Sequence, residues 1–139
     1  MIGNEAPTPD ASHILVVEDN ELNMELVRDI LRAYGYRVGE AFNGQACLNY
    51  LEQEIPDLIL MDLQLPDVNG YTLVQKLRTD VRCQTLPIVA VTAFAMKGDR
   101  EKAMNAGCTG VIMKPIDTRA FPRQVEAYLR GFSEQGPDT

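Results

Sequence analysis

Four short apolar runs stand out when hydrophobic and polar positions are followed along the chain. They cover residues 13–17, 58–61, 87–91 and 110–113. The first three lack the alternation of a half-exposed strand, which is typical of strands covered on both faces of a sheet. A fifth run, residues 36–41, is half polar and predicts a weaker strand. We place this second strand at an edge because it is the least apolar and brings no candidate site residue.

Segments with helical spacing separate these strands. After the first strand, apolar residues between Asn23 and Tyr34 recur on one face, and the pattern stops at Gly35. Asn43 is expected to cap a second helix that runs to about Gln53. The other three helices are expected at about residues 69–79, at about 98–106 before Gly107, and on the stripe formed by Phe121, Val125, Tyr128 and Leu129.

Strands that alternate with helices of this length predict parallel βαβ units. The expected α/β fold is therefore a flavodoxin-like, doubly wound, five-stranded parallel sheet with strand order 2-1-3-4-5 and five helices. A length of 139 residues suits one folded domain. We expect a flexible lead over residues 1–12, the folded domain over 13–131 and a flexible tail over 132–139, because both ends are polar.

Each of the four apolar runs is followed by a polar residue that can bind phosphate or a metal ion. Glu18 and Asp19 follow the first run, and Asp62 follows the second. The third run leads into Thr92 and the last into Lys114. In an open α/β sheet, ligands bind outside the carboxyl ends of the strands. The pattern therefore predicts that all five side chains converge at one edge of one sheet.

The charges at this edge indicate what it binds. Three carboxylates and one ammonium repel each other overall, so the arrangement calls for a divalent cation, and oxygen ligands suit Mg²⁺. A carboxylate can also accept a phosphoryl group, whose charge Lys114 and Mg²⁺ would neutralise while the Thr92 hydroxyl donates to it. Taken singly, each residue has an ordinary explanation, such as a helix cap for Asp19. Their joint occurrence at four strand ends favours one Mg²⁺-dependent phosphoryl site.

Four motifs also carry a resemblance to a known family. In chain order they are Val17-Glu18-Asp19-Asn20, Leu60-Met61-Asp62-Leu63-Gln64-Leu65-Pro66-Asp67-Val68-Asn69-Gly70, Val91-Thr92-Ala93 and Met113-Lys114-Pro115. With these motifs the chain resembles the receiver domain of bacterial two-component response regulators over roughly residues 13–131. Segments 20–24 and 94–100 are similar to single-domain DivK-type regulators and to receivers attached to hybrid histidine kinases.

The resemblance implies a role for each candidate residue. Asp62 would be the phosphoacceptor, Thr92 the switch hydroxyl and Lys114 the phosphate-pairing lysine. The implied Mg²⁺ ligands are Asp19, Asp62, the backbone carbonyl of Gln64 and, through a water molecule, Glu18. A cis peptide bond between Lys114 and Pro115 is implied as well.

The same resemblance implies a signalling function. The chain would accept a phosphoryl group from a histidine kinase or a histidine phosphotransfer protein of a phosphorelay. A face formed by the fourth helix, the fifth strand and the fifth helix would then change and bind a downstream protein. The chain would catalyse only its own phosphoryl transfer and dephosphorylation, so it is not expected to be an enzyme with a separate substrate.

Two positions are expected to modulate this switch. Many receivers carry Tyr or Phe three residues before the lysine, whereas this chain has Val111 there. Signalling is therefore expected to depend on Thr92 moving residues 93–98, without an aromatic switch. Phe94 lies two positions after Thr92, where its apolar bulk is expected to hinder water and lengthen the phosphorylated state.

Composition excludes several other functions. A net charge of −7 and a pI near 4.6, with the 13 Lys and Arg scattered, argue against nucleic acid as a direct ligand. Three cysteines without CxxC spacing predict neither a zinc site nor a disulfide framework, which fits a reducing cytoplasm. The sequence has no signal peptide and no apolar run of membrane-spanning length. We therefore expect a cytoplasmic protein that does not insert into membranes.

Three alternatives stay open. A haloacid-dehalogenase-type phosphatase also uses Asp, Thr and Lys with Mg²⁺, but it needs a second Asp where this chain has Gln64. An interaction protein with a vestigial site is disfavoured because all five site residues are present. The chain could also be a receiver excised from a hybrid histidine kinase, although its polar ends favour a stand-alone regulator.

Overall fold

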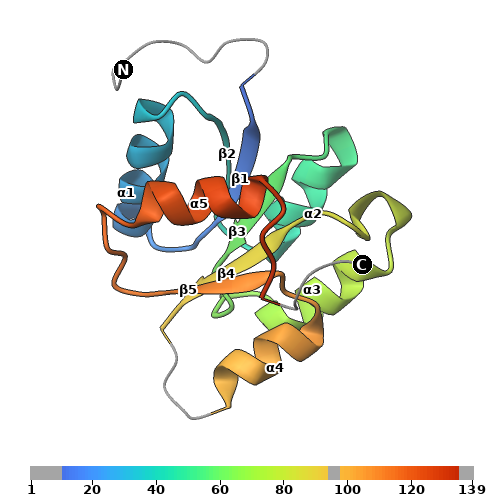
Figure 1. The fold of residues 1–139 in the computed structure, drawn as a ribbon. Coiled ribbons are helices and arrows are strands. Elements are labelled where there is room, and N and C mark those ends of the chain that lie inside the picture. The colour runs from blue at the N-terminus through green and yellow to red at the C-terminus, as the bar shows by residue number, and fades with distance from the viewer. Residues whose placement is uncertain (1–10, 94–97, 135–139) are drawn as a thin grey trace.

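In the computed structural model, which describes residues 11–93 and 98–134, one parallel sheet lies between two groups of helices (Figure 1). The elements are β1 (His13–Val17), α1 (Glu21–Ala33), β2 (Arg37–Ala41), α2 (Gly44–Gln53), β3 (Leu58–Met61), α3 (Gly70–Arg78), a short 3₁₀ helix (Val81–Cys83), β4 (Ile88–Thr92), α4 (Asp99–Ala106), β5 (Gly110–Met113) and α5 (Phe121–Leu129). The strand order is β2-β1-β3-β4-β5, and every pair is parallel. The predicted fold and order are confirmed.

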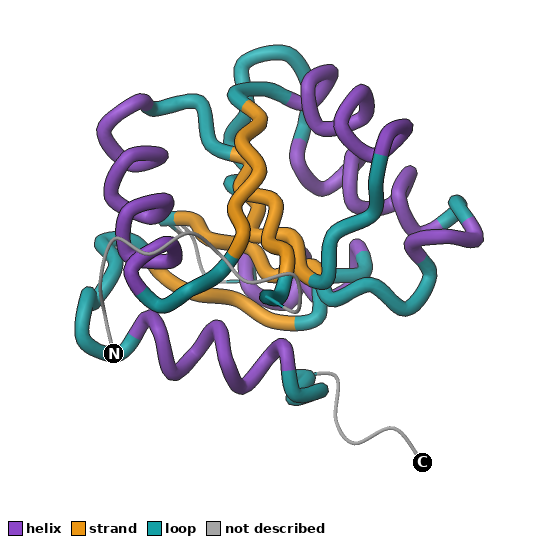
Figure 2. The backbone as a smooth tube through the Cα atoms, turned by 90° about the horizontal axis from the view of Figure 1, so that it is seen from above, coloured by secondary structure: helices purple, strands orange, loops and turns teal. Residues whose placement is uncertain are grey.

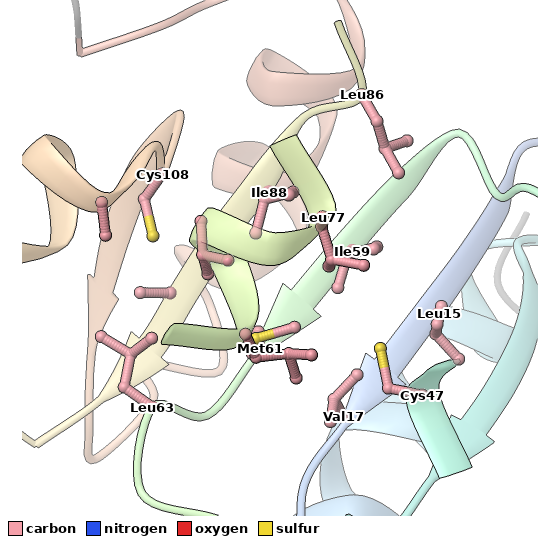
Figure 3. Close-up of a cluster of buried hydrophobic side chains, with 14 of the residues drawn as sticks. Leu15, Val17, Cys47, Ile59, Met61, Leu63, Leu77, Leu86, Ile88 and Cys108 are labelled. Carbon is pink, nitrogen blue, oxygen red and sulfur yellow. The ribbon is translucent and has the colours of Figure 1, made fainter. Parts of the chain in front are cut away.

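The central strands are apolar throughout because helices cover both faces of the sheet (Figure 2). In β1, Ile14 and Val16 pack with the buried side chains of α1 and α5. Leu15 and Val17 point to the other face and pack in a cluster that includes side chains of α2, α3 and α4 (Figure 3). Burial of both faces fixes the register of β1, because a shift by one residue would exchange the two sets of side chains.

Local sequence sets where several helices begin and end. The Asn43 side chain accepts a hydrogen bond from the Ala46 N–H at 2.7 Å, so the predicted cap of α2 is confirmed. Gly107 follows α4 with φ of 119°, a left-handed conformation that glycine adopts without steric cost. The 3₁₀ helix at Val81–Cys83 was not predicted. Asp80 caps it by accepting a hydrogen bond from the Arg82 N–H at 2.9 Å.

The two ends of the chain differ from the simple division into lead, domain and tail. Residues 132–134 lie within the expected tail, yet Glu134 donates its N–H to the Thr109 carbonyl at 2.9 Å. Ser12, in the expected lead, accepts a hydrogen bond from the Arg37 N–H at 3.0 Å. Residues 1–10 and 135–139 lie outside the described part of the chain. Within the described part, no helix has the length and apolar character needed to cross a membrane.

Candidate functional site

The predicted site residues meet at the carboxyl end of the sheet because backbone hydrogen bonds continue past the strands. The Asp62 N–H donates to the Val17 carbonyl at 2.9 Å, and the Lys114 N–H donates to the Thr92 carbonyl at 3.0 Å. Glu18 is tied in the same way to β2. Each functional side chain therefore starts from a backbone position that the sheet holds in place.

Lys114 forms the centre of the ion-pair network. Its ammonium donates to Glu18 Oε1 at 2.6 Å and to Asp62 Oδ2 at 2.9 Å. The two carboxylates are buried, at 4% and 6% exposure, whereas the Lys114 side chain is partly accessible. These are short, charge-assisted hydrogen bonds of the strong kind.

The second oxygen of each buried carboxylate bonds to backbone. Glu18 Oε2 accepts from the Asn20 N–H at 3.1 Å, and Asp62 Oδ1 accepts from the Gln64 N–H at 2.9 Å. The Asn20 side chain in turn accepts a hydrogen bond from Asn23 and caps α1. The loop after each strand thus fixes the orientation of its carboxylate.

Electrostatics leave the site with excess negative charge. Burial raises the pKa of Glu18, and the nearby Lys114 ammonium offsets that rise only in part. Burial lowers the pKa of Lys114, but its hydrogen bonds to Glu18 and Asp62 raise that pKa by more, so the net shift is upward. The lysine therefore stays charged, while the carboxylates would gain from a further cation.

The acidic residues are close enough to share that cation. Ligand oxygens of Glu18, Asp19 and Asp62 all lie within 4.8 Å of one another. Asp19 is exposed, so the cluster is open to solvent on one side. A donor set made only of carboxylate oxygens fits a hard cation such as Mg²⁺, which keeps several of its waters.

The remaining predicted residues differ in where the structure places them. Thr92 is the last residue of β4 and is buried. Gln64 has an exposed side chain on the loop after Asp62. Val111 is buried at 7% exposure within the cluster that also contains α4 side chains. Phe94 lies outside the described residues. The peptide bond between Lys114 and Pro115 is cis, as the family resemblance implied.

A small hollow, which the sequence pattern does not predict, lies beside the site. It has a volume of about 370 Å³ and is lined by Asn23, Leu26, Ala93, Lys114, Pro115 and Ile116. Leu26 is 42% exposed on α1. An apolar residue on the outer side of a predicted helix is a weak signal, because scattered surface hydrophobics are normal.

Comparison with known proteins identifies the family. Residues 14–126 match the protein-family description "Response regulator receiver domain". This chain belongs to the receiver domain family. The polar-differentiation response regulator DivK of Brucella anthropi is 45% identical to this receiver over 116 residues, which cover 84% of this chain and 94% of DivK.

Solved receiver structures share the fold. The receiver domain of a sensor histidine kinase from Pseudomonas aeruginosa is 33% identical, with a TM-score of 0.80, and covers 87% of this chain and 99% of that one. That structure has a magnesium ion coordinated in its active site cleft. The receiver of a signal transduction histidine kinase from Syntrophus aciditrophicus is 28% identical, with a TM-score of 0.81, covering 93% and 98% of the two chains. These matches favour a two-component receiver over a phosphatase.

Proposed function

We propose that this receiver accepts a phosphoryl group on the Asp62 carboxylate from the phosphohistidine of a histidine kinase or histidine phosphotransfer protein. The observation that carries the proposal is the buried Asp62 side chain, which a lysine contacts at 2.9 Å at the open carboxyl edge of the sheet. A new P–O bond to Asp62 forms while the P–N bond to the donor imidazole breaks, and the imidazole leaves.

Each neighbouring residue has a proposed task in that transfer. Lys114 pairs with the incoming phosphoryl oxygens. Before transfer, its positive charge offsets the repulsion between the Glu18 and Asp62 carboxylates. The Thr92 hydroxyl donates to a phosphoryl oxygen. The Gln64 N–H holds the Asp62 carboxylate in one orientation. Phe94 and Val111 modulate the lifetime and readout of the phosphorylated state.

Mg²⁺ is the proposed cofactor. Asp19, Asp62 and the Gln64 backbone carbonyl would hold the ion, and Glu18 would contact it through water. When bound, it supplies positive charge that offsets the carboxylates and the transferred phosphoryl group. The clustered carboxylate oxygens support this assignment, as does the magnesium found in the related kinase receiver.

The phosphorylated protein would signal by binding another protein. We propose that the face formed by α4, β5 and α5 binds a downstream protein once Asp62 is phosphorylated. The protein is proposed to act in the cytoplasm, where its three buried cysteines would stay reduced. Catalysis would be limited to its own phosphorylation and dephosphorylation.

Incubation with a small acyl phosphate and Mg²⁺ tests the central step. Intact-mass measurement should show one added phosphate in the wild type and none in Asp62→Asn or with excess chelator. Asp67→Asn is the matched control, because Asp67 lies in the same loop but bonds to Gly44 and Gln45. In Asp19→Asn, the thermal stabilisation by millimolar Mg²⁺ should be largely lost. Phosphate that persists in Asp62→Asn would refute the assignment.

A further inference from the structure

The open side of β5 is covered by the chain itself. After α5 the chain turns back towards the start of β5, at the edge of the sheet (Figure 1). We call residues 132–134 the return segment. The Glu134 N–H and the Ser133 hydroxyl both donate to the Thr109 carbonyl, at 2.9 and 3.4 Å. The return segment therefore bonds to an edge that would otherwise be open to pairing with another chain.

The Glu134 carboxylate connects three elements of the proposed output face. It accepts hydrogen bonds from the Val111 N–H of β5 and from the Tyr128 hydroxyl of α5, both at 2.7 Å. It also forms an ion pair with Arg100, in the first turn of α4. The Glu134 side chain is only 17% exposed, and the Phe132 ring lies against that of Tyr128 at 5.4 Å between centroids. One side chain thus joins α4, β5 and α5.

Helix α4 buries few large apolar side chains. Its buried residues are two alanines, Ala103 and Ala106, whereas α3 buries Leu73, Val74 and Leu77. Since apolar stabilisation follows the area removed from water, α4 is held more weakly against the sheet than α3. The ion pair between Arg100 and Glu134 ties the start of α4 to the return segment.

We propose that the return segment is an intramolecular latch that holds α4 and β5 in the unphosphorylated arrangement and is released when Asp62 is phosphorylated. This inference rests on the proposed function. We expect the turn of Thr92 towards a phosphoryl group to displace Arg100, which lies in the first turn of α4. A contact made in only one state biases the equilibrium towards that state. Release uncovers the Thr109 carbonyl, the Val111 N–H and the Tyr128 hydroxyl for a protein partner.

Linkage makes the coupling reciprocal. If phosphorylation weakens the latch, then weakening the latch must favour phosphorylation by the same factor. The latch therefore sets the equilibrium between the two arrangements in the unphosphorylated protein. It also controls whether a partner can reach the face formed by α4, β5 and α5.

The unphosphorylated protein provides the first test, with amide hydrogen exchange at Val111 followed by NMR. We expect exchange to be about tenfold faster or more in Glu134→Ala than in the wild type, because the amide loses its acceptor. Glu126→Ala is the control, since Glu126 is exposed on α5 and its carboxylate pairs with Arg130 at 3.6 Å. Arg100→Ala breaks only the link to α4, so it tests the latch without removing the Val111 acceptor. Equal Val111 protection in Glu134→Ala and the wild type would overturn the latch.

The phosphorylated protein provides the second test. After treatment with acyl phosphate and Mg²⁺, Val111 exchange should rise in the wild type and stay unchanged in Asp62→Asn. At a fixed concentration of acyl phosphate, the ratio of phosphorylated to unphosphorylated protein should be about fivefold higher in Glu134→Ala and Arg100→Ala than in the wild type and Glu126→Ala. If mass measurement shows no phosphate on Asp62, the proposed function is refuted. Phosphorylation then cannot be what releases the latch. If phosphate is added but Val111 protection stays at the resting level, the latch is refuted and the proposed function stands.

Discussion

Replacing Lys114 with methionine would test the electrostatics of the site, because methionine keeps an apolar stem of similar length and removes only the ammonium. Glu18 and Asp62 would lose their shared partner, at 2.6 and 2.9 Å, while remaining buried. Neither carboxylate has a second cation among the ion pairs of the described residues. The variant therefore leaves two buried like charges next to each other.

The expected loss of stability follows from these distances. At an effective dielectric constant near 20, each ion pair contributes about 6 kcal/mol of gross attraction. Desolvation of the ammonium offsets much of this gain, and the removal of one partner from a buried pair typically costs about 3–5 kcal/mol. Lys114 is partly accessible, so we expect the lower end, about 3 kcal/mol at pH 7, or a melting temperature roughly 10 °C lower.

The loss of stability in Lys114→Met should become smaller as pH falls. The pKa of Glu18 is raised in the folded protein, so its favourable contribution is present below about pH 4.5 and is lost as pH rises through the folded pKa. Without Lys114 the folded pKa of Glu18 rises further, and the loss extends to higher pH. The free energy of unfolding of Lys114→Met should therefore approach the wild-type value as pH falls from 8 towards 5.

Urea denaturation between pH 5 and 8, with chelator present, measures this deficit. Lys76→Met is the control, since Lys76 is exposed on α3. Adding Asp62→Asn to Lys114→Met should recover part of the lost stability, because one of the two buried charges is removed. A deficit below about 1 kcal/mol, or one that is equal at pH 5 and pH 8, would refute the charge argument.

Two further predictions concern packing around the site. In Gly70→Ala the new Cβ would lie 2.6 Å from the Leu63 carbonyl oxygen, so the loop after Asp62 must shift. We expect the free energy of unfolding to fall by about 2 kcal/mol and phosphorylation by acyl phosphate to become slower. An unchanged urea midpoint would contradict this close approach. Burial raises the pKa of Cys47 to about 12 and that of Cys108 to about 11. The native protein should therefore not react with a thiol reagent at pH 8, whereas the urea-unfolded chain should expose three reactive thiols. Rapid labelling of the native protein would show that these thiols are accessible.

Sequence predicts this fold well because local and long-range signals agree. The runs at residues 58–61 and 88–91 are apolar at every position, and the structure buries them completely. Asn43 precedes its helix as a cap should. Parallel strands point their carboxyl ends to the same edge, so the convergence of Glu18, Asp62 and Lys114 follows from topology alone.

Other features depend on tertiary contacts that no local pattern signals. Sequence does not show that Lys114 pairs with Glu18 as well as Asp62, because this depends on how far each side chain reaches across the edge. Glu134 lies in a polar stretch that looks like a frayed end, and its partners are set only when α5 packs on the sheet. Val111 stands where the family resemblance led us to expect an aromatic residue, but only the structure shows that its N–H bonds to Glu134.

The order in which the site residues occur along the chain has a consequence for synthesis. Glu18, Asp19 and Asp62 precede Lys114, and 52 positions separate Asp62 from this lysine. At a synthesis rate of about 5–20 residues per second, the nascent chain carries the acids for roughly 3–10 s before the lysine is added. Throughout that interval the growing sheet lacks the ammonium that joins Glu18 to Asp62. Docking of β5, the last strand to be made, is therefore the folding step that brings the ammonium to Glu18 and Asp62.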